Sequence, residues 1–480
     1  MSGFGFIGRS VELAFLHRRL DQVTRQVHGT ALAIRGRRQV GKSRLVQEFC
    51  DEAAVPYLFF SAIKGAAPVD SVSRFCRELA ESSLPEDPGL VSLLESGNWF
   101  EAFKILASVL PATPSIVVLD ELPWLAEQDP TFDGSLQMAW DRLLSRRPVV
   151  LLLLGSDLHM MERLTSYDRP FYGRADPMIL GPLNPAETAR ATGLSGADAI
   201  DAQLASGGLP GILRGWPHGM PALDFIRQES AQPVSPLFAV PEATLMAEFP
   251  SPDIAHRVLE AIGSGDRTQA NIAATAGGPG GALVSGTLSP ILHKLTHDKR
   301  VVAMNEPLST RPGKPALYHV ADSNLRLYLA ALRQTQEESR RGRPEVGFRG
   351  VERRWSAWRG RAVEPLIRDS LAMAADGLPW PETTAVGGWW NRSFKPEVDL
   401  VGADRGPVAR QVFFTGSVKW LDGEFDGHAL RAMFEASAQV PGVVPGRTGT
   451  VVVSRSGMAA GVGPVDVHWG PEDIVGVWPV

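Results

Sequence analysis

The chain has 480 residues, of which 44% are hydrophobic and 21% are charged, a composition typical of globular proteins and not of disordered tails or coiled coils. Its 48 basic and 53 acidic residues give a net charge of −5, which excludes a uniformly basic nucleic-acid-binding coat but not a local basic patch. At roughly 150 residues per domain, this length predicts about three domains.

The cysteines and the apolar segments indicate in which cellular compartment the protein is expected. Two cysteines, Cys50 and Cys76, exclude a disulfide framework and a zinc ribbon and suit a reducing environment. The first residues lack the basic end and apolar run of a secretory signal. The longest apolar stretch, residues 149–154, is far shorter than the roughly 20 residues that span a bilayer. We therefore expect a cytoplasmic protein with no membrane partner.

The first half of the chain alternates strands with helices. Short apolar runs bounded by turn residues are typical of strands buried on both faces, and hence of a parallel sheet covered by helices. The expected strands are 31–35, 57–61, 116–119 and 149–154, with 178–180 as a candidate edge strand, and the expected helices are 43–53, 71–83 and 99–110. This pattern predicts a doubly wound α/β core.

The loop between the first strand and the next helix carries a phosphate-binding motif. Residues 36–43 read Gly-Arg-Arg-Gln-Val-Gly-Lys-Ser, which matches G-x-x-x-x-G-K-[ST]. The glycines permit a tight loop with inward-facing N–H groups, and the following helix N-terminus favours anions. Lys42 can reach the β- and γ-phosphates, and the Ser43 hydroxyl can ligate Mg²⁺. The expected ATP-binding residues are Gly36, Arg37, Arg38, Gln39, Val40, Gly41, Lys42, Ser43 and Arg44.

Two acids end the strand at 116–119. Asp120 would hold Mg²⁺, directly or through water, and Glu121 would orient and deprotonate the attacking water. An apolar run followed by acids is weak evidence alone, because many strands end in a solvated Asp. About 77 residues after Lys42, on an expected neighbouring strand, the pair becomes a catalytic candidate.

Two further polar positions are candidates for the same site. Ser156 ends the strand at 149–154 and could contact the γ-phosphate or the attacking water, but Ser156 and Asp157 equally fit a helix N-cap. Arg174 could supply charge to a γ-phosphate as an arginine finger or sensor does, in cis or in trans, but it could also be a surface arginine.

Beyond Pro182 the pattern turns helical, at 185–192 and 197–205, and prolines between 210 and 241 then break the chain, so we place a boundary near 235–250. Helices at 254–261, 269–275 and 283–297, followed by strands at 301–304 and 317–320, have winged-helix spacing. The third helix could enter a DNA major groove, with basic residues His293, Lys294, His297, Lys299 and Arg300 for the phosphates. A protein-contact role is equally compatible with this pattern.

An arginine-rich segment follows. Residues 333–368 hold ten arginines and five glutamates, a net charge of +5, and Trp355 and Trp358 lie among them. Arginine with an aromatic ring can bind a phosphate backbone and stack on bases. The alternative is a solvated helix whose tryptophans face the core. Strand candidates at 398–401, 408–414 and 450–453 then predict a final α/β unit.

Together these motifs resemble the archaeal-type P-loop ATPases, close to the AAA+ and STAND classes. The matching segments are 6–13, 36–43, 117–124, 154–156, 172–174 and 207–210. The resemblance implies an ATPase core with strand order 5-1-4-3-2, a helical lid, a winged-helix domain and a C-terminal restriction-endonuclease-like domain. The expected limits are 1–182 for the core, 183–245 for the lid, 246–332 for the winged helix, 333–350 for an arginine-rich linker and 351–480 for the last domain.

The C-terminal segment resembles the PD-(D/E)xK nuclease core, in which a helical Glu, a strand Asp and an acid two residues before a Lys hold Mg²⁺. Glu364, Asp399 and Lys419 match three roles, but Ser417 stands where the second acid belongs. Glu397, on the same strand face as Asp399, could substitute for it. We expect this site to be degenerate and nuclease activity to be lost.

The sequence therefore predicts a Mg²⁺-dependent ATPase that acts as a nucleotide-driven switch on a protein or DNA partner. The alternatives are a DNA-binding regulator tuned by ATP and, less favoured, a metal-dependent nuclease. Partner, pathway and oligomeric state are not predicted.

Overall fold

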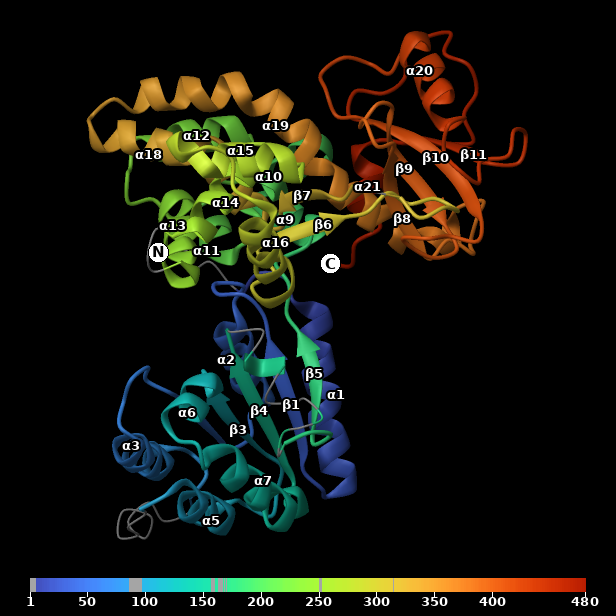
Figure 1. Cartoon of the computed structure of the whole chain (residues 1–480). Helices are drawn as coiled ribbons and strands as arrows, with labels where there is room; N and C mark the ends of the chain where they lie inside the picture. The colour runs from blue at the N-terminus through green and yellow to red at the C-terminus, as the bar shows by residue number, and fades with distance from the viewer. Residues whose placement is uncertain are drawn as a thin grey trace. The chain divides into compact units, whose positions relative to one another are not determined.

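The computed structural model describes residues 6–85, 97–156, 160–162, 167, 169, 171–249, 253–313 and 315–480, apart from the side chains of 247 and 248. The chain forms two compact units, Met1–Pro182 and Leu183–Val480 (Figure 1). Within the described ranges, none of the helices has the length and apolar character needed to cross a membrane.

The first unit is built on a five-stranded parallel sheet. Its strands are β1 (Thr30–Arg35), β2 (Tyr57–Ser61), β3 (Ser115–Asp120), β4 (Val149–Gly155) and β5 (Ala175–Ile179). Their order is β2-β3-β4-β1-β5, and every neighbouring pair is parallel. The expected α/β core is thus confirmed, and read from β5 the order is 5-1-4-3-2. Because the strands are parallel, the ends of β1, β3 and β4 meet at one edge.

Helices cover both faces of this sheet. On one face, large rings from β2 and the helices pack edge to face, among them Phe60, Phe75, Trp99 and Phe132. Helices α1 and α2 cover the other face (Figure 1). The helices are α1 (Ser10–Gln26), α2 (Lys42–Ala53), α3 (Pro68–Glu81), α5 (Trp99–Val109), α6 (Leu122–Gln128) and α7 (Phe132–Arg142), with a short turn η1 (Leu144–Arg146).

The second unit begins with α9 (Pro185–Thr192), α10 (Gly196–Ser206), α11 (Pro210–Leu213), α12 (Ala222–Ser230) and α13 (Pro236–Glu248). The helix α13 differs from our expectation, since it runs through the predicted boundary at 245/246. Pro236 occupies its first turn, where no N–H is needed, and the Ser235 side chain caps it, while Pro241 is accommodated inside the helix.

Residues 254–332 fold in the predicted order of three helices and a hairpin. The elements are α14 (Ile254–Gly263), α15 (Gln269–Gly277), η2 (Gly278–Gly280), α16 (Ser285–His293), a π-helical turn η3 (Lys294–Asp298), β6 (Val302–Asn305), β7 (Leu317–Val320), α17 (Ser323–Leu327) and η4 (Tyr328–Leu332). The strands β6 and β7 pair antiparallel. Identification of this segment as a winged helix stays a prediction.

The arginine-rich segment is helical. Helix α18 (Arg333–Arg340) leads into α19 (Pro344–Met373), which is continuous through the expected linker end at 350/351. Phe348, Val351 and Trp355 are buried on one side of α19. Most of the expected linker 333–350 is thus helical, and apolar residues at helical spacing anchor α19 to the unit.

The C-terminal region carries a mixed sheet of order β12-β11-β10-β9-β8, with β8, β9 and β10 antiparallel and β10, β11 and β12 parallel. The predicted strand 408–414 starts too early: β10 begins at Val412, and its register against β9 shifts between Val412 and Phe414. The remaining elements are η5 (Ala375–Gly377), β8 (Ala385–Trp390), β9 (Glu397–Ala403), β10 (Val412–Lys419), α20 (Gly427–Ser437), β11 (Gly449–Ser454), β12 (Val467–Trp469) and α21 (Pro471–Gly476). Its restriction-endonuclease-like identity stays a prediction.

Candidate functional site

The loop 36–43 joins β1 to α2 at the edge where the strands end. Gly41 has φ 93° and Gln39 has φ 66°, so the backbone turns sharply before the helix. A Cβ at Gly36 would lie 2.3 Å from the Leu180 carbonyl oxygen, which excludes any side chain there. The helix begins at Lys42, one residue earlier than expected. The sequence thus folds into a narrow loop that leads into a helix N-terminus.

Lys42 is folded over this loop. Its ammonium donates hydrogen bonds to the carbonyl oxygens of Gly36 at 2.7 Å and Arg37 at 3.0 Å, and the residue is 6% exposed. Burial lowers the pKa of Lys42 to about 8; Glu121 and Asp120 oppose this shift and Arg38 adds to it. The loop therefore holds a desolvated cation near two carboxylates.

The Mg²⁺ candidates lie together. Ser43 donates a hydrogen bond from its hydroxyl to Asp120 Oδ2 at 2.7 Å, although 77 residues separate them. The other oxygen of Asp120 accepts a hydrogen bond from the Glu121 backbone N–H at 2.9 Å. A hydroxyl and a carboxylate at this separation are hard oxygen donors of the type that Mg²⁺ prefers.

The predicted base Glu121 lies beside Ser156. Glu121 has a left-handed backbone, φ 55°, at the start of α6, and this aims its side chain toward the end of β4. The Ser156 hydroxyl lies 2.9 Å from each carboxylate oxygen, and the Ser156 N–H lies 3.4 Å from Oε2. Asp157, the alternative cap, lies outside the described residues. The structure therefore brings Lys42, Ser43, Asp120, Glu121 and Ser156 to one sheet edge.

The remaining loop side chains contribute less. Arg38, Gln39 and Arg44 are exposed. Arg44 pairs with Glu48 at 2.7 Å, one turn along α2, and lies over the Phe6 ring at 6.0 Å from its centroid. Arg44 is thus held along α2 and does not close over the loop.

Arg9, in the segment 6–13 that carries part of the family resemblance, supports the loop. It is 4% exposed, has φ 65°, and donates hydrogen bonds to the carbonyl oxygens of Val40 at 2.9 Å and Gly181 at 2.7 Å. It also pairs with Glu12 at 3.1 Å. Arg9 thus ties the loop to the end of the β5 segment. Segment 6–13 gave the signal for this residue, since both Arg9 and Glu12 belong to it.

The structure does not bring Arg174 to the loop. Arg174 precedes β5, whose first residue Ala175 is level with Ala31 at the start of β1. The loop follows the other end of β1, roughly 15 Å away at the usual strand rise. Arg174 instead forms a two-pronged ion pair with Asp141 on α7, at 2.7 and 2.8 Å. The expectation that it acts in cis therefore conflicts with its position; a role in trans stays a prediction.

The nuclease-like residues form a second acidic cluster, at β9, β10 and α19. Asp399 Oδ2 accepts hydrogen bonds from the Ser417 hydroxyl at 3.0 Å and the Val418 N–H at 2.9 Å. Glu364 pairs with Arg368 at 3.2 Å, and Arg368 also donates to the Asp399 carbonyl oxygen at 2.8 and 3.0 Å. Within the described ranges, Lys419 makes no hydrogen bond or ion pair with Glu364 or Asp399.

Glu397, the candidate substitute ligand, is bound by an arginine from another segment. Arg267, in the turn before α15, contacts both carboxylate oxygens, at 2.6 and 3.2 Å. Burial acts to raise the pKa of Glu397, but the hydrogen bond and charge of Arg267 outweigh it and lower this pKa. Burial raises the pKa values of Glu364 and Asp399, against the opposing charge of Arg368.

These contacts do not fit a metal centre. Two guanidinium groups occupy the positions next to the carboxylates that a divalent cation would need. Among the residues that the structure describes, no group of three or more His, Cys, Asp or Glu side chains is arranged to hold a metal ion. No catalytic step through Mg²⁺ is therefore derived at Glu364, Asp399 and Lys419.

Comparison with known proteins gives distant similarities. No family model matches the chain. An uncharacterized protein of Methanocaldococcus jannaschii is 22% identical over 425 residues, which cover 87% of this chain and 88% of that protein.

Among solved structures, a Walker-type ATPase of Pyrococcus abyssi has a TM-score of 0.47 at 18% identity and covers 68% of this chain and 96% of its own. The ORC2 protein of Aeropyrum pernix, in ADPNP–ADP complexes, has a TM-score of 0.44 at 13% identity and covers 71% and 96%. The ORC1 protein of the same organism, in complex with DNA, has a TM-score of 0.33 at 15% identity and covers 71% and 94%. At TM-scores below 0.5, these similarities do not define the fold of the whole chain.

Proposed function

We propose that this chain binds ATP at the loop 36–43 and hydrolyses it with Mg²⁺. The observation that carries the proposal is the cluster at the sheet edge, in which Lys42 covers the loop, Ser43 meets Asp120 at 2.7 Å and Ser156 meets Glu121 at 2.9 Å. These residues come from three different strand ends, and this convergence is typical of a phosphoryl-transfer site.

The residues fit both the nucleotide and the metal. The loop offers backbone N–H groups, a helix N-terminus and a cation whose present partners are only neutral carbonyl groups, so phosphate oxygens could replace them at little cost. Ser43 and Asp120 would hold Mg²⁺, which when bound neutralises phosphate charge. The lowered pKa of Lys42 is consistent with a cation that lacks its anionic partner.

Glu121 would act as the general base. Its carboxylate would accept a proton from the attacking water, while the Ser156 hydroxyl holds and orients that carboxylate. In this arrangement Ser156 is a positioning residue. From the sequence, Ser156 was a candidate for contact with the γ-phosphate or the attacking water, or for a helix N-cap, and the bond to Glu121 is a further contact.

Two substitutions test this proposal. Lys42→Ala is expected to weaken ATP binding, measured by calorimetry, by about 100-fold or more, because the charge-assisted bonds to phosphate are lost. Glu121→Gln is expected to retain affinity within about threefold but to lower hydrolysis by about 100-fold or more. Lys64→Ala, at an exposed lysine elsewhere in the first unit, is the control. Equal ATP affinity in wild type and Lys42→Ala would overturn the proposal.

We also propose that the nucleotide state acts on a partner through the second unit. The chain's division into an ATPase-like unit and a larger unit supports this idea. Purification of Glu121→Gln with ATP, compared with Lys42→Ala, tests it: a protein or nucleic acid retained only by Glu121→Gln is expected. Identical co-purifying material from both variants would contradict the switch.

A second candidate function is a DNA-binding regulator tuned by ATP. The helix–hairpin order of residues 254–320 and the net charge of +5 over residues 333–368 favour it. If the wild-type chain binds neither duplex nor single-stranded DNA at low salt, this candidate function is excluded.

A further inference from the structure

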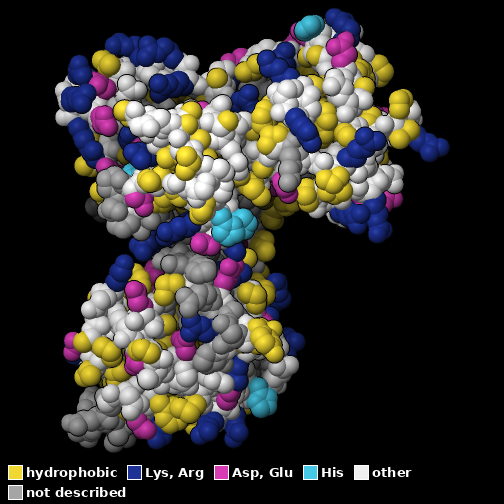
Figure 2. Space-filling model, viewed as in Figure 1, with side chains coloured by type: hydrophobic (Ala, Val, Ile, Leu, Met, Phe, Trp, Pro, Cys, Tyr) yellow, Lys and Arg dark blue, Asp and Glu magenta, His cyan; other side chains and the backbone are white. Residues whose placement is uncertain are grey.

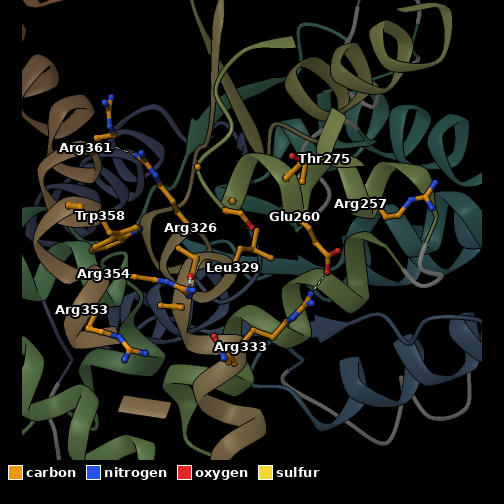
Figure 3. A pocket seen from close by; sticks show the side chains of 18 residues that line it. Arg257, Glu260, Thr275, Arg326, Leu329, Arg333, Arg353, Arg354, Trp358 and Arg361 are labelled. Atoms are coloured by element: carbon orange, nitrogen blue, oxygen red, sulfur yellow. Dashed lines mark hydrogen bonds and ion pairs between the residues drawn. The ribbon is translucent and has the colours of Figure 1, made fainter. Parts of the chain in front are cut away.

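A pocket of about 800 Å³ lies in the second unit, between α14, the segment 326–334 and α19. Figure 3 shows its side chains converging from these elements. One acid, Glu260, lines it, together with six arginines: Arg257, Arg326, Arg333, Arg353, Arg354 and Arg361. A surplus of five positive charges around one cavity requires a counter-charge, because like charges destabilise one another when solvent is displaced.

The structure neutralises only part of this surplus. Arg333 forms an ion pair with Glu260, and Arg361 lies 4.0 Å from Glu397, a carboxylate outside the pocket. Arg354 and Arg326 donate to the backbone carbonyl oxygens of Ala330 and Arg361 at 2.8 and 3.2 Å. Arg257 and Arg353 are exposed, and in the described part of the chain their guanidinium groups have no hydrogen-bond or ion-pair partner. The two unpaired groups lie on different helices, α14 and α19, on either side of the pocket (Figure 3).

Arg326 is a buried guanidinium in the wall of the pocket. Burial lowers its pKa to about 10; Glu364 opposes this shift, whereas Arg267 and Arg361 add to it. An anion in the pocket would stabilise the charged form of this buried guanidinium and so raise its pKa. Planar guanidinium groups match phosphate oxygens by paired hydrogen bonds, which makes arginine a common phosphate ligand.

Trp358 adds an aromatic surface. One side of its indole stacks on the buried Trp355, with ring centroids 5.3 Å apart, and the residue also lines the pocket. In Figure 3 Trp358 lies between Arg354 and Arg361 along α19. A fixed indole flanked by arginines is the arrangement that stacks an unpaired base while its phosphates are neutralised.

The basic surface is longer than one nucleotide. Arg353 and Arg361 are two turns apart on α19, about 12 Å along a helix. Exposed arginines continue beyond the pocket, at Arg349 and along α18, and Figure 2 shows basic side chains gathered over α18 and the start of α19. This extent favours a ligand with several phosphates over a single nucleotide.

We propose that this pocket binds a single-stranded nucleic acid, with phosphates on Arg257, Arg353 and Arg361 and a base against Trp358. The proposal deepens the second candidate function, since it names the ligand and the residues, and it does not depend on nucleotide at the loop 36–43. A duplex fits less well, because its bases are stacked on one another and cannot reach the indole face.

The test measures binding of a fluorescent oligothymidylate of about 15 nucleotides by anisotropy, without ATP, across a range of salt concentrations. The double variant Arg257→Glu/Arg353→Glu is expected to weaken binding about tenfold or more at low salt. It should also reduce the slope of log affinity against log salt by about 1.4, or 0.7 for each lost phosphate contact. Since neither guanidinium has a partner among the residues that the structure describes, the variant should fold normally, as circular dichroism can verify.

Two controls sharpen the experiment. Arg392→Glu/Arg431→Glu makes the same change in net charge at exposed arginines outside the pocket and is expected to leave affinity within about twofold. Trp358→Leu should cost about tenfold in affinity, while Trp358→Phe should recover part of it.

Several results would overturn the proposal. Unchanged affinity in the pocket variant would show that Arg257 and Arg353 do not contact the nucleic acid. An equal loss of affinity in the charge-matched control would show that only the net charge of the chain matters. Equal binding of duplex DNA would exclude the role of Trp358. Displacement of the oligonucleotide from the Lys42→Ala protein by equimolar free ATP, or by an acidic peptide, would identify a different ligand. Failure of ATP binding at the loop would leave these outcomes unaffected.

Discussion

Two clusters of carboxylates lie in this chain, one in each unit: the first follows the end of β3, and the second lies on β9 and α19. In the first unit, Asp120 and Glu121 bind the hydroxyl groups of Ser43 and Ser156. In the second unit, Glu364 and Glu397 bind the guanidinium groups of Arg368 and Arg267. Both clusters contain the residue types found in metal-binding sites. Their carboxylate oxygens differ in their partners, which are hydroxyl groups in the first cluster and guanidinium groups in the second.

The difference lies in what must be displaced before a ligand can bind. A serine hydroxyl on a carboxylate brings no charge of its own, so water or Mg²⁺ can replace it at the carboxylate without leaving a second buried charge unpaired. A buried guanidinium–carboxylate pair is held by charge-assisted bonds, and breaking it leaves an unpaired charge in a low-dielectric interior. Clustered acids therefore indicate a catalytic site only when their present partners are replaceable.

The largest effect is expected from removal of the guanidinium in the second cluster. In Arg368→Met, the buried Glu364 loses its cation, and the local opening free energy of β9 and β10 should fall by about 3–5 kcal/mol at pH 7.5. The pKa of Glu364 is already raised by burial and would rise further. A raised acid pKa costs stability above its unfolded value, so the loss should diminish as the pH falls toward about 4.5.

Hydrogen exchange of peptides from β9 and β10 measures this opening. Arg431→Met, on the exposed surface of α20, is the matched control, with an expected change below about 0.5 kcal/mol. Unchanged exchange in Arg368→Met would show that the guanidinium does not hold the cluster together.

The two serine hydroxyls allow a direct comparison of the clusters. Ser156→Ala removes the hydroxyl that orients Glu121 and should lower ATP hydrolysis by about tenfold with little change in ATP affinity. Ser417→Ala removes the equivalent hydroxyl from Asp399 and should leave hydrolysis unchanged. Steady-state kinetics with both variants tests the contrast, and equal effects of the two changes would contradict it.

Lys42 makes the first cluster sensitive to pH, because burial lowers its pKa to about 8. Free Lys42 loses its proton near pH 8, and bound phosphate would restore the charged form. ATP affinity should therefore fall by up to about tenfold per pH unit above pH 8, with uptake of nearly one proton on binding. Calorimetry in buffers of different ionisation enthalpy measures this uptake, which Lys42→Arg should abolish.

The lowered pKa of Lys42 also makes the free energy of unfolding depend on pH. The unfolded lysine has a pKa of 10.5 and the folded one about 8, so the unfolded state binds more protons between these values. The cost of burying the charge is fully present below pH 8 and is relieved as the pH rises toward 10.5. Lys42→Met should remove this rise of stability between pH 8 and 10.5, as denaturant unfolding at several pH values can measure.

Much of the first unit could be predicted because its signals are local. The loop motif, the apolar strands and the acids after β3 are each contained in a few residues, and parallel pairing brings their ends together. The second unit depends on contacts that a sequence pattern does not reveal. Arg267 and Glu397 are 130 residues apart, and neither has a distinctive context.

The elements that differed from expectation have physical reasons as well. Prolines at 236 and 241 indicated breaks, yet the first lies in the opening turn of α13 and packing accommodates the second. The charged surface of 333–350 indicated a linker, but the buried face of α19 provides the apolar stripe of an anchored helix. In both segments tertiary contacts outweighed local preference.

The smallest effect is expected at Arg174, where the local motif resembled a catalytic arginine. Its ion pair with Asp141 is partly exposed, and the hydrogen bond from Arg174 lowers the pKa of Asp141. Exposed pairs contribute about 0–1 kcal/mol, so Arg174→Ala should lower the free energy of unfolding by no more than about 1 kcal/mol. It should change the rate of ATP hydrolysis by dilute protein by no more than about twofold. A loss of activity that grows with protein concentration would instead indicate that Arg174 acts on the loop of a neighbouring chain. Assays over a range of protein concentrations separate the two outcomes, because a residue that acts within its own chain has no concentration dependence.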